Sequence, residues 1–165
     1  MANKDCIITQ KLLHELYEYH DGNLYNKKYR NSSSKIGDIV GSKYNKGYIV
    51  TYINNVRYSV HRLIFMYHHG YLPKFIDHIN GKRDDNHIEN LREASLSQNA
   101  CNRSITSTNK SGIKGVHWNN YHKKWTAVCW LNKKSYFVGH FKILEDASKA
   151  VIKKRQELHG EFATN

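Results

Sequence analysis

The 165-residue sequence has few cysteines, one proline and no long apolar run, and each scarcity excludes a class of protein. Its three cysteines, Cys6, Cys101 and Cys129, lie far apart and form no CxxC pair. This excludes a zinc ribbon and argues against a disulfide framework. No apolar run approaches the roughly 20 residues of a membrane span, and residues 1–10 lack the features of a signal peptide. We therefore expect a soluble cytoplasmic protein without a membrane partner.

Acidic residues are also scarce, because 14 Asp and Glu stand against 26 Lys and Arg, for a formal charge of +12 and a pI near 9.6. The imbalance grows toward the C-terminus, where residues 108–165 carry eleven Lys and Arg against four Asp and Glu. Such a charge keeps a protein in solution, but it is more often the footprint of a polyanion. The composition therefore indicates a nucleic acid partner, and the 12 tyrosines leave structured RNA open beside double-stranded DNA.

The stretch FIDHINGKRDDNHIENLREASLSQNACNR, residues 75–103, is a compact succession of short elements. A short apolar step runs into Asp77-His78, and the turn pair Asn80-Gly81 follows. A second strand is expected around Leu91-Arg92, and a polar helix over residues 95–102. The order is strand, loop, strand and helix.

Four polar residues of this stretch, Asp77, His78, Asn90 and Asn99, come from separate elements that such a fold would bring together. A carboxylate beside an imidazole, faced by two amides, suits a one-metal site that cleaves a phosphodiester. A surface hairpin followed by a helix would use Asn and Asp merely to make its turns. The spacing alone leaves both interpretations open.

Residue types in this stretch occur in the order and spacing of the HNH motif, and the stretch resembles the HNH endonucleases, or ββα-metal nucleases. It is most similar to the variant, common in phage homing endonucleases, whose third motif residue is Asn. The preceding residues 61–64 resemble a helix start that often precedes the motif in those proteins. The resemblance covers residues 60–102 and is carried by Asp77-His78, Asn80-Gly81, Asp85-Asn86, Asn90-Leu91-Arg92 and Asn99.

The resemblance implies a metal-dependent, site-specific DNA endonuclease. His78 would be the general base, Asn90 would orient its imidazole, and Asp77 and Asn99 would bind one Mg²⁺ or Mn²⁺ per active site through hard oxygen atoms. No small-molecule cofactor is expected. One metal and one base act on one strand, so the enzyme would bind DNA as a monomer and nick it. The intact Asp77-His78 pair argues against the alternative of a non-catalytic DNA-binding regulator.

The segment before the motif is expected to form a small β-rich extension. The predicted elements are a helix over residues 9–20 with Thr9 as its N-cap, a strand at Leu24-Tyr25, a β-hairpin over residues 48–60 that turns at Asn54-Asn55, and a helix over residues 61–69 that Gly70 ends.

After a polar linker at residues 104–112, the pattern changes to three short strands and a helix. The strands are expected at residues 115–118, 125–131 and 135–141, and the helix at residues 144–159. In the second strand, alternation directs Trp125, Ala127 and Cys129 to the helix and leaves Thr126, Val128 and Trp130 on an open face. That face could enter a DNA groove, or Trp130 could contact another protein.

This module resembles the Apetala-two, or ethylene-response-factor, DNA-binding domain of plants. About fifty residues match, among them Ser111-Gly112 to Gly115-Val116, Lys124 to Ala127, Val138 to Phe141, Glu145 to Ala147 and His159-Gly160. The resemblance implies DNA contacts from the sheet face, although the arginines of that family are mostly missing here. The predicted reading face consists of Lys114, His117, Val128, Trp130, Ser135 and Phe137.

Further contacts to DNA are predicted from Lys133 and Lys134, which lie at a strand turn within reach of phosphates, and from Arg92 and Arg103. In all, we expect an α+β protein with a ββα-metal nuclease core and its N-terminal extension in residues 1–103, a linker in residues 104–112, and a three-stranded antiparallel sheet with one packed helix in residues 113–165.

Overall fold

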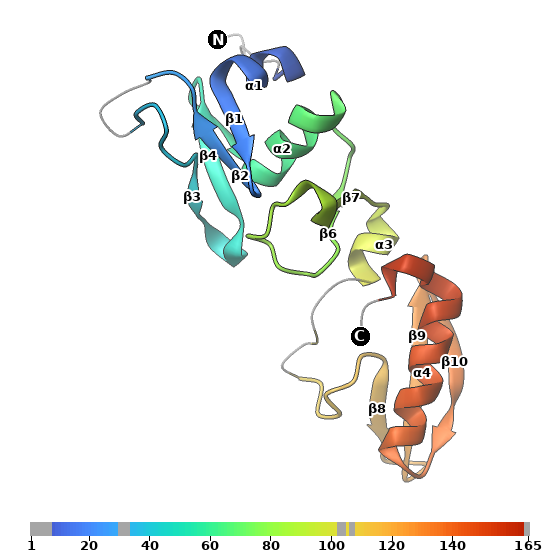
Figure 1. Cartoon of the computed structure of the whole chain (residues 1–165). Coiled ribbons are helices and arrows are strands. Elements are labelled where there is room, and N and C mark those ends of the chain that lie inside the picture. The colour runs from blue at the N-terminus through green and yellow to red at the C-terminus, as the bar shows by residue number, and fades with distance from the viewer. Residues whose placement is uncertain (1–7, 30–33, 102–104, 106–107, 164–165) are drawn as a thin grey trace, which may run out of the picture. The chain divides into compact units, whose positions relative to one another are not determined.

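The computed structural model describes residues 8–29, 34–101, 105 and 108–163. The described chain contains four α-helices and several small antiparallel sheets, which confirms the predicted α+β class (Figure 1). It divides into two compact units, Met1–Glu93 and Ala94–Asn165. The domain limits at residues 103 and 113 stay predictions. The linker lies partly outside the described residues.

The first unit begins with helix α1, Gln10–Leu16, and the hairpin of β1, Tyr17–His20, and β2, Asn23–Asn26. The side chain of Thr9 accepts a hydrogen bond from the amide of Leu12 at 3.2 Å, so the predicted N-cap is confirmed. The prediction that this helix continues to His20 is wrong, because α1 ends at Leu16 and residues 17–20 form β1.

The strand β1 replaces the last turn of the predicted helix because two local signals favour it. Burial alternates along the strand, with Tyr17 buried and Glu18 exposed, which is the period of a β-strand. Asp21 and Gly22 follow with φ values of 47° and 73°, which is the geometry of a two-residue hairpin turn. The turn therefore fixes a hairpin where the helical pattern would have continued.

A second sheet contains β3, Ser42–Lys43, β4, Ile49–Ile53, and β5, Val56–Ser59. Asn54 and Asn55 join β4 to β5 with φ values of 51° and 64°, so the predicted hairpin is confirmed. Helix α2, Val60–His69, follows directly and ends at Gly70 in the left-handed conformation, also as predicted.

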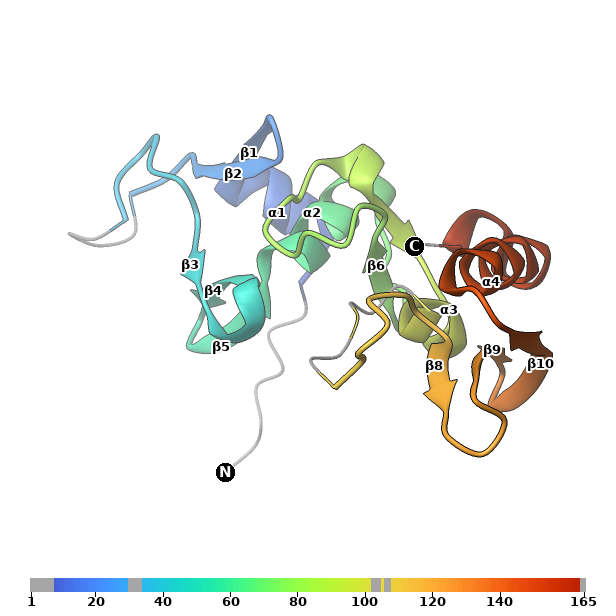
Figure 2. The ribbon, with the colours of Figure 1, turned by 90° about the horizontal axis from the view of Figure 1, so that it is seen from below.

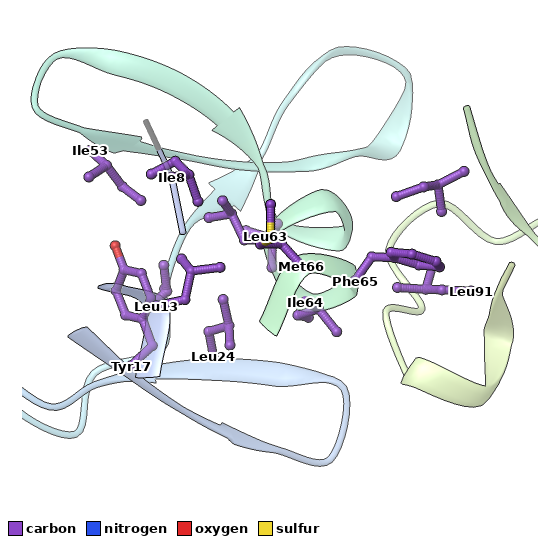
Figure 3. Packing of buried hydrophobic residues seen from close by; sticks show 13 residues of the cluster. Ile8, Leu13, Tyr17, Leu24, Ile53, Leu63, Ile64, Phe65, Met66 and Leu91 are labelled. Atoms are coloured by element: carbon purple, nitrogen blue, oxygen red, sulfur yellow. The ribbon is translucent and has the colours of Figure 1, made fainter. Parts of the chain in front are cut away.

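Helix α2 is the centre of the core of the first unit (Figure 3). Leu63 and Ile64 are fully buried, and side chains from α1 and the β1–β2 hairpin pack around the helix. Because α2 is buried against several elements, its N-terminal residues are held in fixed positions. The main partners from other elements that are labelled in Figure 3 are Leu13, Tyr17, Leu24 and Leu91.

The last two strands of the unit are β6, Ile76–His78, and β7, Leu91–Glu93. They are antiparallel, with Asp77 opposite Arg92 and His78 opposite Leu91. The loop between them, residues 79–90, closes with a 3₁₀ turn at Ile88–Asn90. Both strands lie where the sequence predicts them.

The second unit contains α3, Leu96–Cys101, and a three-stranded sheet in the order β10-β9-β8 covered by α4, Leu144–His159 (Figure 2). The strands are β8, Val116–Asn119, β9, Lys124–Leu131, and β10, Lys134–Phe141. Its core is the cluster Val116, Ala127, Ala147 and Val151 between sheet and helix. The predicted three strands and packed helix are confirmed. A short 3₁₀ turn, Gly160–Phe162, follows α4, and the first unit has another at Asn45–Gly47.

The alternation predicted for β9 is confirmed with one exception. Ala127 and Cys129 are buried, and Trp130 is 61% exposed. Thr126 lies on the predicted open face but is only 5% exposed, because its hydroxyl forms a hydrogen bond of 2.9 Å with Nδ1 of His140 on the neighbouring strand. Within the described part of the chain, no helix has the length and hydropathy needed to cross a membrane.

Candidate active site

The candidate site is centred on strand β6, which carries Asp77 and His78 as adjacent residues. Their side chains are only 4% and 5% exposed, so both polar groups are held inside the fold. Successive side chains of a strand point to opposite faces, and the two groups therefore have different surroundings. Buried polar groups of this kind need hydrogen-bond partners, and these partners define the site.

Asp77 is held by Arg92, its neighbour across the β6–β7 pair. Both Nε and Nη2 of Arg92 donate to Oδ2 of Asp77, at 3.0 and 2.9 Å. Charge-assisted bonds of this kind are short and strong, and they fix the orientation of the carboxylate. The DNA contact expected of Arg92 stays a prediction, while the structure gives its guanidinium an internal partner.

His78 is held by Asn86, a residue of the β6–β7 loop that is 1% exposed. Nε2 of His78 lies 3.2 Å from Oδ1 of Asn86. An amide oxygen only accepts hydrogen bonds, so in this arrangement Nε2 carries the proton and Nδ1 carries the lone pair. Burial lowers the pKa of His78, against smaller opposing contributions from Asn86 and Asp77. The imidazole is therefore neutral at pH 7 and able to accept a proton.

The orienting role predicted for Asn90 is wrong in this structure. Oδ1 of Asn90 accepts a bond of 3.0 Å from the amide of Asn80, and Nδ2 donates to Oδ1 of Asn80 and to the carbonyl of Asp85, at 3.1 and 2.7 Å. Asn90 thus ties the ends of the loop together and does not bond to His78. Asn86 belongs to the motif, but the sequence alone assigns it no role, because nothing in the spacing separates its amide from that of Asn90.

The loop is also fastened to the β1–β2 hairpin through His87. Its Nδ1 lies 2.7 Å from Oδ1 of Asp85, and its Nε2 lies 3.0 Å from Oδ1 of Asp21. These bonds, with Asp85 the larger contributor, raise the pKa of His87 to about 9, so the imidazole is positively charged at pH 7. A cation between two carboxylates holds the β6–β7 loop against a turn more than sixty residues away in the sequence.

Two further rings, those of His61 and Tyr48, lie close to His78. The ring centroid of His61, at the start of α2, is 5.1 Å from that of His78. Tyr48 lies 5.3 Å from His61 and 6.1 Å from His78. Nδ1 of His61 is buried and has no hydrogen-bond partner among the described residues. Burial, followed by the charges of His78 and Arg62, lowers the pKa of His61 to about 3.

The first unit is expected to lose stability as the pH falls from about 6.5 toward 3, because the unfolded chain binds a proton at His61 that the folded chain excludes. The pKa of about 3 against about 6.5 when unfolded corresponds to a loss on the order of 5 kcal/mol in the free energy of unfolding. Urea unfolding followed by tyrosine near-UV circular dichroism at pH 7, 5.5 and 4.5 measures the part of this loss, about 3 kcal/mol, that is expected by pH 4.5.

His61→Phe should remove this part of the pH dependence, whereas the same change at the exposed His20 should keep it. All three tryptophans lie in the second unit, so tryptophan fluorescence follows that unit separately. An unchanged pH dependence in His61→Phe would show that another group is responsible.

Comparison with known proteins connects this geometry to a family. The model of the HNH endonuclease family matches residues 58–101, from the end of β5 to the end of α3. Over 96 residues, or 57% of its length, the chain is 32% identical to Protein 3.8 of Escherichia phage T7 and covers 78% of it. This chain belongs to the HNH endonuclease family.

A second relative is the uncharacterized HNH endonuclease L560 of Acanthamoeba polyphaga mimivirus, which is 32% identical over 120 residues. That alignment covers 71% of this chain and 61% of the relative. No solved structure matches.

The HNH match places the buried Asp77-His78 pair at the centre of the domain but does not by itself locate a metal. Among the described residues, no three His, Cys, Asp or Glu side chains gather in a group that could hold a metal ion. The predicted ligands are one carboxylate, Asp77, and one amide, Asn99, which offer the oxygen donors that Mg²⁺ prefers. Asn99 lies half-buried on α3 in the second unit, so its pairing with Asp77 stays a prediction. Arg103 lies outside the described residues.

The sheet of the second unit places five of the six predicted reading residues on one face. Strand register sets His117 beside Thr126, Phe137 beside Val128, and Ser135 beside Trp130, all on the face opposite to α4. Trp130 and Phe137 are 61% and 62% exposed. Lys114 instead lies in the loop before β8, where its carbonyl accepts a bond of 2.6 Å from Arg155.

The two lysines predicted to reach phosphates lie at the end of the same sheet. Lys133 is in the turn between β9 and β10 with a φ of 65°, and Lys134 begins β10. Both are exposed, and the ammonium of Lys134 lies 5.5 Å from the centroid of the Tyr136 ring. Their contacts with DNA stay predictions.

Proposed function

We propose that this protein is a metal-dependent, site-specific DNA endonuclease of the homing type, in which His78 is the general base for hydrolysis of a phosphodiester. The observation that carries the proposal is the buried Asp77-His78 pair within the HNH match, with Nε2 of His78 held by Asn86 at 3.2 Å. This contact leaves Nδ1 as the proton acceptor. A neutral imidazole with a defined tautomer is what removal of a proton from water requires.

Asp77 and Asn99 are the residues that would bind the metal, and their oxygen donors fit Mg²⁺ or Mn²⁺. Such an ion neutralises charge on the phosphate and assists the leaving oxygen. Arg92 would share the carboxylate of Asp77 with the metal. Its two bonds fix the direction of the carboxylate before a metal arrives.

The catalytic step that this chain supplies is a proton transfer. Nδ1 of His78 takes the proton from the attacking water, while Asn86 keeps the proton on Nε2 and prevents rotation of the ring. Burial keeps the imidazole neutral before the reaction. The site holds one base of this kind, so one chain should cleave one strand and act as a monomer on double-stranded DNA.

The second unit is the proposed DNA-binding module. Its support is the open sheet face with exposed Trp130 and Phe137, the lysines at the sheet end, and the excess of positive charge in residues 108–165. Lysines contact phosphates without regard to sequence, whereas side chains of the sheet face can reach base edges in a groove. A module of this design would increase affinity and direct the nuclease to a site.

Supercoiled plasmid DNA provides the test of this function. Incubation with Mg²⁺ or Mn²⁺ is expected to give the nicked circle before any linear form, and EDTA should stop the reaction. Binding of the plasmid without cleavage at any metal concentration would favour a DNA-binding regulator. Preferential binding of structured RNA at fixed salt would favour an RNA-binding protein.

A further inference from the structure

Arg83, in the β6–β7 loop, is held by a segment that lies outside the HNH match. Its Nη1 donates a hydrogen bond of 3.0 Å to the carbonyl of Lys46, in the connection between β3 and β4. Its guanidinium also lies 5.2 Å from the centroid of the Tyr48 ring, within the range of a cation–π contact. The side chain is half-buried and is fixed on two sides.

The position of Arg83 is close to the proposed base. The Tyr48 ring that it covers is the ring that lies 6.1 Å from the imidazole of His78. Among the described residues, the guanidinium has no acidic partner and no hydrogen-bond acceptor other than the carbonyl of Lys46.

A cation fixed beside the base, with N–H donors left over, has the chemistry of a phosphate site. The guanidinium is planar, always charged, and forms paired hydrogen bonds with two phosphate oxygens. Lys43, another cation of this region, already has an acidic partner, because its Nζ forms an ion pair of 2.8 Å with Asp84. Arg83 is thus available for a ligand while Lys43 fastens the same loop.

We infer that Arg83 binds a phosphate of the DNA backbone at the active site, and that Lys46 and Tyr48 of the N-terminal extension position it for this contact. The inference rests on the proposed endonuclease function. It gives the extension a role in the active site, because residues 46 and 48 precede the HNH match that begins at residue 58. The ligand is a phosphodiester next to or at the point of cleavage.

A merely structural role for Arg83 would be to hold the β3–β4 connection against the catalytic loop. The two roles differ in what they predict for binding. Replacement of a structural residue changes stability and lowers DNA affinity by the same factor at every salt concentration. Loss of a phosphate contact instead changes how strongly DNA affinity depends on salt. Arg57 is a matched control, because its guanidinium also covers a tyrosine, Tyr44, at 4.7 Å, in the same sheet region.

DNA affinity of the full chain is measured in the His78→Ala background, so that cleavage does not interfere, with a duplex of defined sequence over a range of salt. Arg83→Ala should weaken binding about tenfold at low salt and reduce the slope of log affinity against log salt by about one. Arg83→Lys should recover the slope but only part of the affinity, because an ammonium cannot make paired bonds. Arg57→Ala should leave affinity within about twofold.

Cleavage rates in the otherwise unchanged chain test the positioning. Arg83→Ala should lower kcat at least tenfold, and Tyr48→Leu should lower it less, while Tyr48→Phe keeps the ring and the rate. In the Arg83→Ala background, Tyr48→Leu should have little further effect, because its role acts through Arg83.

Three outcomes overturn the inference while the wild-type chain still cleaves DNA. They are an unchanged salt slope in Arg83→Ala, equal losses in Arg57→Ala and Arg83→Ala, and additive effects of Tyr48→Leu and Arg83→Ala. Failure of the wild-type chain to cleave would instead reject the endonuclease function. The salt slope of Arg83→Ala would then still report whether Arg83 contacts phosphate.

Discussion

Replacement of His78 by alanine should lower the rate of DNA cleavage at least about 100-fold and leave the affinity for DNA nearly unchanged. The variant loses the buried, neutral imidazole that Asn86 holds beside Asp77. Single-turnover cleavage of a plasmid measures the rate, and a band-shift assay in EDTA measures the affinity.

The 5% exposure of His78 means that alanine leaves a cavity and an unsatisfied acceptor at Asn86. His78→Gln is therefore a second variant, since its amide can still donate to Asn86 but cannot act as a base. His20→Ala removes an exposed imidazole of the same unit and should cleave at the wild-type rate. Wild-type turnover in a folded His78→Gln variant would remove His78 from the mechanism.

Most elements could be predicted from the sequence where a local signal dominates. Asn54-Asn55 between two apolar strands defines a hairpin by itself, and Gly70 after a periodic helix defines its end. Helix α4 follows its predicted limits, Leu144–His159, because its apolar spacing is regular and it packs on a single sheet. In these cases the local conformational preference and the tertiary structure agree.

The misplaced end of α1 shows where local signals conflict. Residues 17–20 continue a helical spacing of apolar side chains, yet they also alternate as a strand does. The turn at Asp21-Gly22 and pairing with β2 decide between the two. Pairing with a later segment is a non-local interaction, and periodicity within a short window does not contain it.

The sequence predicts which residues form the candidate site, but it predicts only part of the contacts that these residues make. The adjacent Asp77 and His78 are found from the motif, but the partners of each depend on how the loop of residues 79–90 folds. Asn86 reaches His78 and Asn90 does not, because the side chain of Asn90 is used by Asn80 and Asp85.

Contacts from outside the motif had no signal in the sequence. The surroundings of His61 follow from where α2 is packed, and the contact between Arg83 and Tyr48 joins segments more than thirty residues apart. In both cases the residues that meet are separated in the sequence by a spacing that matches no helical or strand period and no motif. Both contacts depend on how the extension packs against the HNH domain.

The second large effect is expected from Asp77→Asn, which keeps the shape of the side chain and removes its charge. If Asp77 binds the metal, cleavage in Mg²⁺ should fall on the order of 100-fold or more, because stabilisation by a metal is worth several kcal/mol and each ~1.4 kcal/mol is a factor of ten. The variant also leaves the guanidinium of Arg92 without its carboxylate partner, so thermal unfolding should be recorded to separate lost stability from lost catalysis.

Asp84→Asn is the matched control for Asp77→Asn, since Asp84 lies in the loop that follows β6 and forms an exposed ion pair with Lys43. Its removal should leave the metal dependence of cleavage unchanged. Rates measured over a range of Mg²⁺ and Mn²⁺ distinguish the two carboxylates, because loss of a metal ligand raises the metal concentration needed for half-maximal rate.

Arg92→Ala completes the set: it removes the partner that fixes the carboxylate and should raise the metal requirement less than Asp77→Asn does. If Asp77→Asn and the wild type cleave equally well in Mn²⁺, Asp77 is not a ligand, and its ion pair with Arg92 serves only to hold β6 and β7 together.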